Sequence, residues 1–165
     1  MARLSTWERI VSGISPSAEV CEVGAGDARF AEHILSSCSN VYTYTAVDRW
    51  ARPGGYEDAA TRLAPFGGRV RILRTRSTDA ALQVPDSSLD VVFLRGGDRT
   101  PRGFVTDLVA WWPKVRPGGI LGGGGFWEGS AHTAVTAAVL GFADGVPGAC
   151  LVHNATEYAI VKPPV

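Results

Sequence analysis

An apolar strand that runs into two closely spaced glycines is the feature that most constrains this chain. Val20–Val23 lead into Gly24 and Gly26, and a helical pattern follows. A second apolar run ends in Asp48, 22 residues after Gly26. A strand, a glycine turn, a helix and a strand with an acid at its tip predict a nucleotide-binding βαβ unit. Glycine allows the tight turn and a close approach of backbone to ligand, and the acid can accept both hydroxyls of a ribose.

The third position of the glycine pattern restricts the kind of nucleotide. A dinucleotide-binding loop reads G-x-G-x-x-G or A, and its last small residue lets the helix N-terminus approach a pyrophosphate. Here that position holds Arg29, a bulky cation that fits the dinucleotide pattern badly. The loop suits a ligand that has no pyrophosphate and only a short zwitterionic tail. An NAD-dependent oxidoreductase is therefore disfavoured.

Strand and helix patterns alternate along the chain and predict a single domain over residues 1–165, with a helical segment over residues 1–19. Strands are expected at Val20–Val23, Tyr42–Val47, Val70–Leu73, Leu89–Leu94 and Gly119–Leu121, and a closing hairpin at Cys150–His153 and Glu157–Val161. Helices are expected at Ser5–Ser12, Ala28–Ser36, Tyr56–Leu63, Asp79–Leu82, Phe104–Trp112 and His132–Leu140. These elements predict an α/β, doubly wound, Rossmann-like sheet of seven strands, mostly parallel, with a C-terminal antiparallel hairpin. Gly122–Gly125 are predicted to form a loop.

Charge and cysteine content restrict the partners and the compartment. Lys+Arg and Asp+Glu both total 16, so no whole-protein field attracts nucleic acid or an anionic membrane. Cys21, Cys38 and Cys150 are widely spaced and form no C-x-x-C pair. The sequence has no apolar run of the length that spans a membrane. We therefore expect a cytoplasmic protein that binds neither nucleic acid nor membrane.

The second half of the chain resembles a known family. Asp107–Gly123 contains the run AWWPKVRPGGILGG, and with Ser87–Leu94 it is similar to methyltransferase family 24. This family is a small-molecule O-methyltransferase group among the class I S-adenosylmethionine (SAM) methyltransferases. Glu22-x-Gly24-x-Gly26 and Asp48 look like the first two motifs of that class. Further similarity lies in Val47–Trp50 and Leu73–Ser77, and the whole resemblance extends over Val20–Lys162.

The resemblance implies that SAM is the cofactor. The glycine loop and Glu22 would hold its methionine end, Asp48 its ribose, and Trp50 would lie beside the adenine, which Ser77 and Thr78 would line. Arg95 would pair with a carboxylate of SAM or of the substrate, or else face solvent or pair with Asp98. The residues expected to bind the cofactor are Glu22, Gly24, Ala25, Gly26, Asp48, Arg49, Trp50, Ser77, Thr78 and Arg95.

The chain departs from the family at the positions that carry its chemistry. In the family, the fourth strand ends in an aspartate with a histidine nearby, and the fifth strand ends in Gly-Gly-His-Asp-Tyr. These groups bind a metal or act as the base. Here the positions hold Arg95 and Gly124–Gly125, followed by Phe126. A hard divalent cation needs several oxygen ligands, so we expect no catalytic metal. Asp98 and His132 are the candidate bases, although each is equally explained as a capping, paired or surface residue.

Two functions are compatible with these observations. The first is a SAM-dependent methyltransferase that methylates an oxygen of a small molecule without a metal. The alternative is a SAM- or nucleoside-binding protein that has lost catalysis and acts as a partner or regulator. Only a short segment precedes the first strand, so a lid would come from Trp50–Tyr56, from Gly122–Ser130 or from another subunit of a homo-oligomer.

Overall fold

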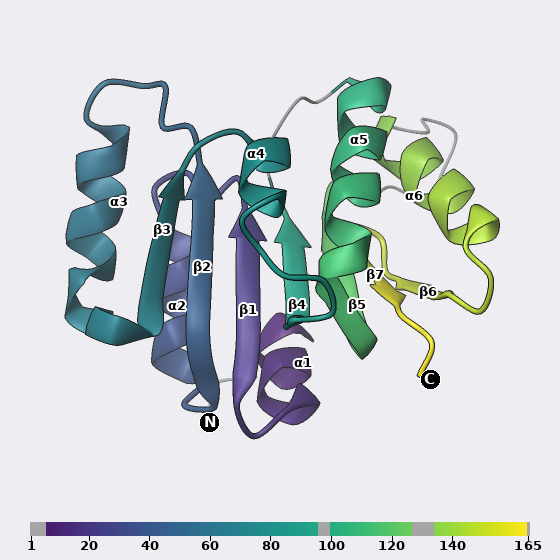
Figure 1. Cartoon of the computed structure of the whole chain (residues 1–165), viewed down its shortest axis with the longest axis horizontal. Coiled ribbons are helices and arrows are strands. Elements are labelled where there is room, and N and C mark those ends of the chain that lie inside the picture. The colour runs from purple at the N-terminus through teal and green to yellow at the C-terminus, as the bar shows by residue number, and fades with distance from the viewer. Residues whose placement is uncertain (1–5, 96–99, 127–133, 165) are drawn as a thin grey trace.

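One sheet of seven strands, in the order β3-β2-β1-β4-β5-β7-β6, forms the centre of the computed structural model (Figure 1). The structure describes residues 6–95, 100–126 and 134–164. The strands are β1 (Ala18–Val23), β2 (Val41–Asp48), β3 (Val70–Arg74), β4 (Leu89–Leu94), β5 (Val115–Gly124), β6 (Cys150–His153) and β7 (Glu157–Val161). Strands β1 to β5 pair in parallel, while β7 pairs antiparallel with both β5 and β6. This arrangement confirms the predicted mostly parallel sheet with a C-terminal hairpin.

Helices cover both faces of the sheet, and Figure 1 shows α4 and α5 in front of it and α2 behind it. The helices are α1 (Thr6–Ile14), α2 (Arg29–Ser37), α3 (Gly55–Leu63), α4 (Ser77–Ala81), α5 (Pro101–Trp111) and α6 (Ala134–Gly145), with short 3₁₀ turns η1 (Ala64–Arg69) and η2 (Trp112–Lys114). A span of the bilayer needs about 20 apolar residues in a helix. No helix in the described ranges has the length and apolar character that crossing a membrane requires.

The central strands are buried because helices cover both faces of the sheet. Every residue of β4 is buried, as expected for a parallel strand with helices on both faces. Phe93 packs in the core cluster formed with α1, α2 and α3, whereas Val92 packs in the cluster formed with α4, α5 and α6. The buried Asp90 is paired, since its carboxylate accepts the Glu19 N–H at 2.7 Å and lies 3.2 Å from Nη1 of Arg116.

Strand β5 is longer than predicted, and the loop predicted at Gly122–Gly125 is wrong for its first residues. Gly122, Gly123 and Gly124 lie in β5, between β4 and β7. A Cβ added at Gly122 would lie 2.6 Å from the carbonyl oxygen of Tyr158 and against the ring of Trp7. These glycines therefore serve close packing inside the sheet, a role that a run of glycines in the sequence does not distinguish from a loop.

We expect Gly122→Ala to lower the free energy of unfolding by about 1–3 kcal/mol, because the added methyl overpacks a closed site. The matched control is Gly13→Ala in α1, where an added Cβ has nothing within 4 Å. Alanine is the better helix former, so this control should raise stability by up to ~1 kcal/mol. Urea unfolding curves of the three proteins measure both effects. Equal midpoints for wild type and Gly122→Ala would show that β5 has room for the methyl.

Candidate functional site

The candidate site lies at the carboxyl end of the sheet, where the order of the strands changes direction. From β1 the chain builds outward through β2 and β3, and it then returns to the other side of β1 with β4 and β5. Val23 is level with Val47 of β2 and with Leu94 of β4, so these three strands end together. Open parallel sheets bind their ligands in the crevice at such a switch point. The residues that directly follow β1, β2 and β4 therefore meet at this end of the sheet.

The loop after β1 turns through glycines in the left-handed region, with φ of 87° at Gly24 and 55° at Gly26. Its N–H groups are used inside the protein. Those of Gly24 and Ala25 donate to the carbonyl of Val47 at 2.8 and 3.1 Å, and that of Gly26 donates to Asp48 at 3.0 Å. These three N–H groups are therefore not free to cradle a pyrophosphate. This geometry agrees with the prediction, based on Arg29, that the ligand has no pyrophosphate.

The side chain of Asp48, at the tip of β2, accepts hydrogen bonds from two backbone N–H groups. Its Oδ2 accepts the N–H of Gly26, and its Oδ1 accepts the N–H of Trp50 at 2.8 Å. A carboxylate has about four lone-pair positions, so these two bonds leave acceptor capacity on both oxygens. Asp48 is half-buried. It therefore combines an anchoring role with the capacity to accept ribose hydroxyls.

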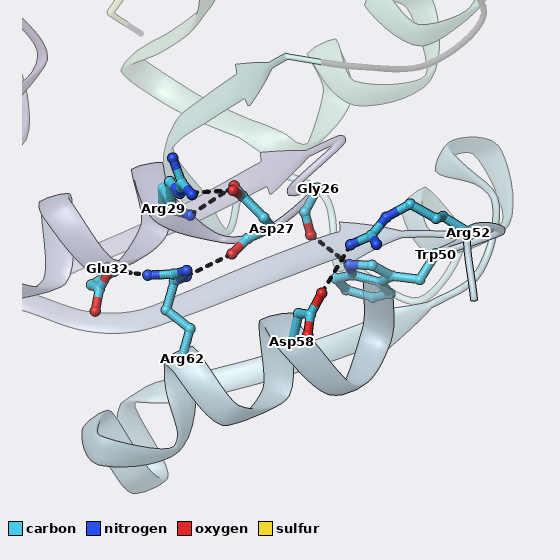
Figure 2. A network of polar contacts seen from close by, with 8 residues as sticks. All are labelled: Gly26, Asp27, Arg29, Glu32, Trp50, Arg52, Asp58 and Arg62. Carbon is cyan, nitrogen blue, oxygen red and sulfur yellow. Dashed lines mark hydrogen bonds and ion pairs between the residues drawn. The ribbon is translucent and has the colours of Figure 1, made fainter. Parts of the chain in front are cut away.

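Trp50 holds the other side of the same loop (Figure 2). Its Nε1–H donates to the carbonyl of Gly26 at 2.7 Å, and its ring packs edge-to-face on Tyr56, with centroids 5.5 Å apart. The residue is buried and has a left-handed φ of 46°, which is unusual for a tryptophan. We expected Trp50 beside an adenine from the sequence. The structure shows that its indole N–H binds the backbone of the glycine loop, and a position beside the adenine stays a prediction.

Helix α3 reaches the loop through Arg62, a residue that the sequence analysis did not identify. Its Nε donates to the carbonyl of Asp27 at 2.9 Å, and its Nη1 lies 2.8 Å from a carboxylate oxygen of Glu32 on α2 (Figure 2). Arg62 thereby links α3, the loop and α2. Together with Asp48 and Trp50 it fixes the backbone of Gly26 and Asp27, and we call these three side chains the loop clamp.

An open groove of about 570 Å³ lies between α2 and α3 on the outer side of this clamp. Its charged lining is internally paired: Arg29 with Asp27 at 2.9 Å and Arg52 with Asp58 at 2.9 Å (Figure 2), besides the contacts of Arg62. Because these charges satisfy one another, the groove offers little for an ionic ligand. The candidate site is therefore the carboxyl end of β1, β2 and β4 and not this groove.

Glu22 lies beneath the loop in β1 and is buried, with 1% of its surface exposed. Its Oε2 accepts the hydroxyl hydrogen of Tyr44 at 2.9 Å, and its Oε1 lies 3.6 Å from Nε of Arg95. Burial raises the pKa of the Glu22 carboxyl to about 8, although the Tyr44 hydrogen bond and the Arg95 charge act in the opposite direction. Burial in the folded protein therefore favours the protonated form of this carboxyl group.

The turn after β3 brings two more predicted residues to the edge of the sheet. Thr75 donates its N–H to the carbonyl of Asp48 at 3.0 Å, which places the start of α4 beside the end of β2. Ser77 begins α4, and its Oγ accepts Nε1–H of Trp111 at 2.8 Å. Thr78 is exposed. Ser77 thus anchors α5.

The segments that follow β4 and β5 lie only partly within the described residues. Asp98 and His132, the predicted bases, lie outside the described residues. At the ends of β4 and β5 the structure places Arg95, the exposed Gly124 and Gly125, and the buried Phe126. Within residues 6–95, 100–126 and 134–164 no cluster of three or more His, Cys, Asp or Glu side chains is arranged to hold a metal ion.

The raised pKa of Glu22 gives a pH dependence of stability. Between pH of about 4.5 and about 8 the unfolded chain loses this proton while the folded chain keeps it, so stability falls as pH rises. The slope approaches ~1.4 kcal/mol per pH unit for one proton. Glu22→Gln keeps the shape and an acceptor for Tyr44 but cannot ionise, so its stability should exceed that of wild type near pH 8 and match it near pH 5.

Unfolding in urea across this pH range, without cofactor, measures the slope. Glu19→Gln is the matched control, because Glu19 lies in the same strand and is more exposed. This control should keep the wild-type slope. Identical slopes for wild type and Glu22→Gln would show that Glu22 is ionised in the folded protein.

Comparison with solved structures finds the same fold in proteins that include methyltransferases. A protein from Corynebacterium glutamicum aligns with a TM-score of 0.74 and 19% identity, covering 96% of this chain and 78% of its own. An O-methyltransferase family protein from Burkholderia thailandensis has a TM-score of 0.74 and 15% identity, covering 96% of this chain and 55% of its own. A putative methyltransferase from Streptococcus mutans, solved with S-adenosylhomocysteine, has a TM-score of 0.72 and 13% identity. The alignment covers 94% of this chain and 95% of the Streptococcus protein.

The sequence comparison identifies the family. No curated protein sequence matches the chain. The family model of methyltransferase family 24, described as a methyltransferase domain, matches residues 21–123 of the 165. This match covers the glycine loop, the clamp and strands β2 to β4, and most of β5. The chain therefore belongs to methyltransferase family 24 and is a SAM-dependent methyltransferase.

Proposed function

We propose that this methyltransferase transfers the methyl group of SAM to a hydroxyl oxygen of a small molecule, without a catalytic metal. The main support is the set of residues at the ends of β4 and β5. Where the family places an aspartate and a His-Asp pair, this chain has Arg95 and a run of glycines. A guanidinium repels a divalent cation, and glycine offers it only a carbonyl, so these positions suit a reaction driven by positioning and a base.

The proposed cofactor site is the crevice at the switch point. Asp48 would accept the ribose hydroxyls, the backbone of Gly24 and Gly26 would face the methionine end, and Ser77 and Thr78 would border the adenine. The donors and acceptors present fit such a ligand: a carboxylate with open lone pairs for a diol, and a glycine loop without a free row of N–H groups for phosphate. The balanced total charge of the chain favours a small acceptor over a nucleic acid.

SAM supplies an activated methyl carbon on a sulfonium, so the protein needs to align an acceptor and remove a proton. The oxygen–carbon bond forms as the carbon–sulfur bond breaks, and the hydroxyl proton passes to a base. Alignment of the two reactants can lower the activation free energy by roughly 7–11 kcal/mol. A general base increases the rate of the chemical step by roughly 10²–10⁴-fold. Asp98 and His132 remain the proposed bases.

The test is transfer from labelled SAM to matched panels of phenols, alcohols and amines, with EDTA or with Mg²⁺. We expect methylation of hydroxyl acceptors that is unchanged by EDTA. Asp98→Asn or His132→Ala should lower kcat by roughly 10²–10⁴-fold and leave SAM affinity unchanged. Activity that EDTA abolishes and Mg²⁺ restores would overturn the metal-free mechanism. Tight SAM binding without transfer to any acceptor would favour a catalytically inactive binding protein.

The loop clamp predicts a second effect, on cofactor affinity. Trp50→Phe keeps an aromatic ring but removes the N–H that holds the Gly26 carbonyl, and a neutral hydrogen bond contributes about 0.5–1.5 kcal/mol. We expect SAM to bind about 2–12-fold more weakly, as measured by calorimetry. Trp112→Phe is the control, because Trp112 packs on Phe142, away from the loop. Equal losses of affinity in the two variants would show that the clamp does not position the loop.

A further inference from the structure

Arg95 is fixed at the switch point itself. It directly follows β4, and its backbone N–H donates to the carbonyl of Val23, the last residue of β1, at 2.9 Å. This bond places Arg95 over the junction of β1 and β4, next to the start of the glycine loop. A side chain at this position borders the crevice in which parallel sheets of this order bind their ligands.

The guanidinium of Arg95 is held on one face and open elsewhere. Its central carbon lies 4.1 Å from the centroid of the Phe30 ring, on α2, in a cation–π contact. Its Nε is 3.6 Å from a carboxyl oxygen of Glu22, yet 43% of the side chain is exposed to solvent. Within the described chain, no residue forms a hydrogen bond with its two terminal nitrogens. The guanidinium is thus oriented by Phe30 and Glu22, and its terminal N–H groups have no hydrogen-bond partner among the described residues.

The ion pair between Glu22 and the guanidinium of Arg95 is weak. A separation of 3.6 Å exceeds the range of a charge-assisted hydrogen bond, which is about 2.7–2.9 Å. The carboxyl group already accepts the hydroxyl hydrogen of Tyr44 at 2.9 Å, and burial raises its pKa to about 8. At neutral pH Glu22 is therefore a weak counter-ion. Among the described carboxyl groups, Glu22 alone lies within 4 Å of the Arg95 guanidinium, and its protonated form carries no charge to balance that of Arg95.

We propose that Arg95 is a carboxylate-binding residue of this methyltransferase. A planar guanidinium with its terminal N–H groups free binds a carboxylate in a two-pronged geometry. Two sources present this group at the crevice: the amino-acid tail of the cofactor, or an acid group on the acceptor. The proposal deepens the proposed function and rests on it, but its first test needs cofactor binding alone.

The first arm compares S-adenosylhomocysteine with 5′-deoxy-5′-methylthioadenosine, which lacks the amino-acid tail. Both are titrated by calorimetry into Glu22→Gln and into the double variant Glu22→Gln/Arg95→Gln. The Glu22→Gln background ensures that removing Arg95 leaves no stranded carboxyl beneath it. If Arg95 binds the cofactor tail, the double variant should lose about tenfold or more in affinity for S-adenosylhomocysteine and less than about twofold for the tailless ligand.

The second arm titrates benzoate and benzamide into the same two proteins saturated with S-adenosylhomocysteine. If Arg95 faces the acceptor, benzoate should bind more tightly than benzamide, and the preference should disappear in the double variant. This arm measures binding and not turnover, so a failure to methylate hydroxyl acceptors would leave it intact. The two arms therefore distinguish the sources of the carboxylate and separate this proposal from the reaction type.

Arg74→Gln is the matched control, because Arg74 also lies over an aromatic ring, with its central carbon 4.7 Å from the centroid of Tyr56. It removes an equal charge and a similar cation–π contact and should leave both comparisons unchanged. Arg95→Lys, in the same background, keeps the charge without the planar fork and should recover only part of the effect. The proposal is overturned if the double variant shows neither a selective loss for the tailed ligand nor a loss of the benzoate preference.

Discussion

The bridge made by the Asp48 carboxylate is the interaction on which the glycine loop after β1 depends. One oxygen holds Gly26 in the loop after β1, and the other holds Trp50 beyond the tip of β2. Trp50 in turn reaches back to the carbonyl of Gly26. The three residues form a closed set of hydrogen bonds that joins two parallel strands at their ends. Without the acid, the amide of Gly26 and the unusual backbone of Trp50 would both lose their partner.

Desolvation is the second constraint, and it acts beneath the loop. A glutamate in a strand covered on both faces is costly to ionise, and in this chain the cost appears as a raised pKa of Glu22. Tyr44 makes the buried acid tolerable by donating to it. The consequence reaches the surface, because a protonated Glu22 cannot balance Arg95. The burial of Glu22 in β1 thus weakens its ion pair with Arg95 at the end of β4.

Much of the fold was predictable from sequence, since the strand and helix patterns and the spacing of Gly24, Gly26 and Asp48 are local signals. What the sequence did not reveal depends on packing between distant segments. Arg62 meets the loop only because α3 lies against α2. Gly122 belongs to a strand only because Trp7 and β7 close over it. The contact between Tyr44 and Glu22 had one signal in the sequence. Tyr44 is a residue with a hydroxyl group in an apolar strand next to the strand that carries Glu22.

The loop after β1 is already fixed by bonds that involve no ligand. Backbone from Gly24 to Asp27 is fastened to β2 and α3. Ordering a flexible loop costs conformational entropy, about 1–2 kcal/mol for each residue that is fixed. In this protein folding itself meets that cost, so binding does not have to meet it again. A ligand that binds at this loop should therefore require little rearrangement of the backbone when it associates.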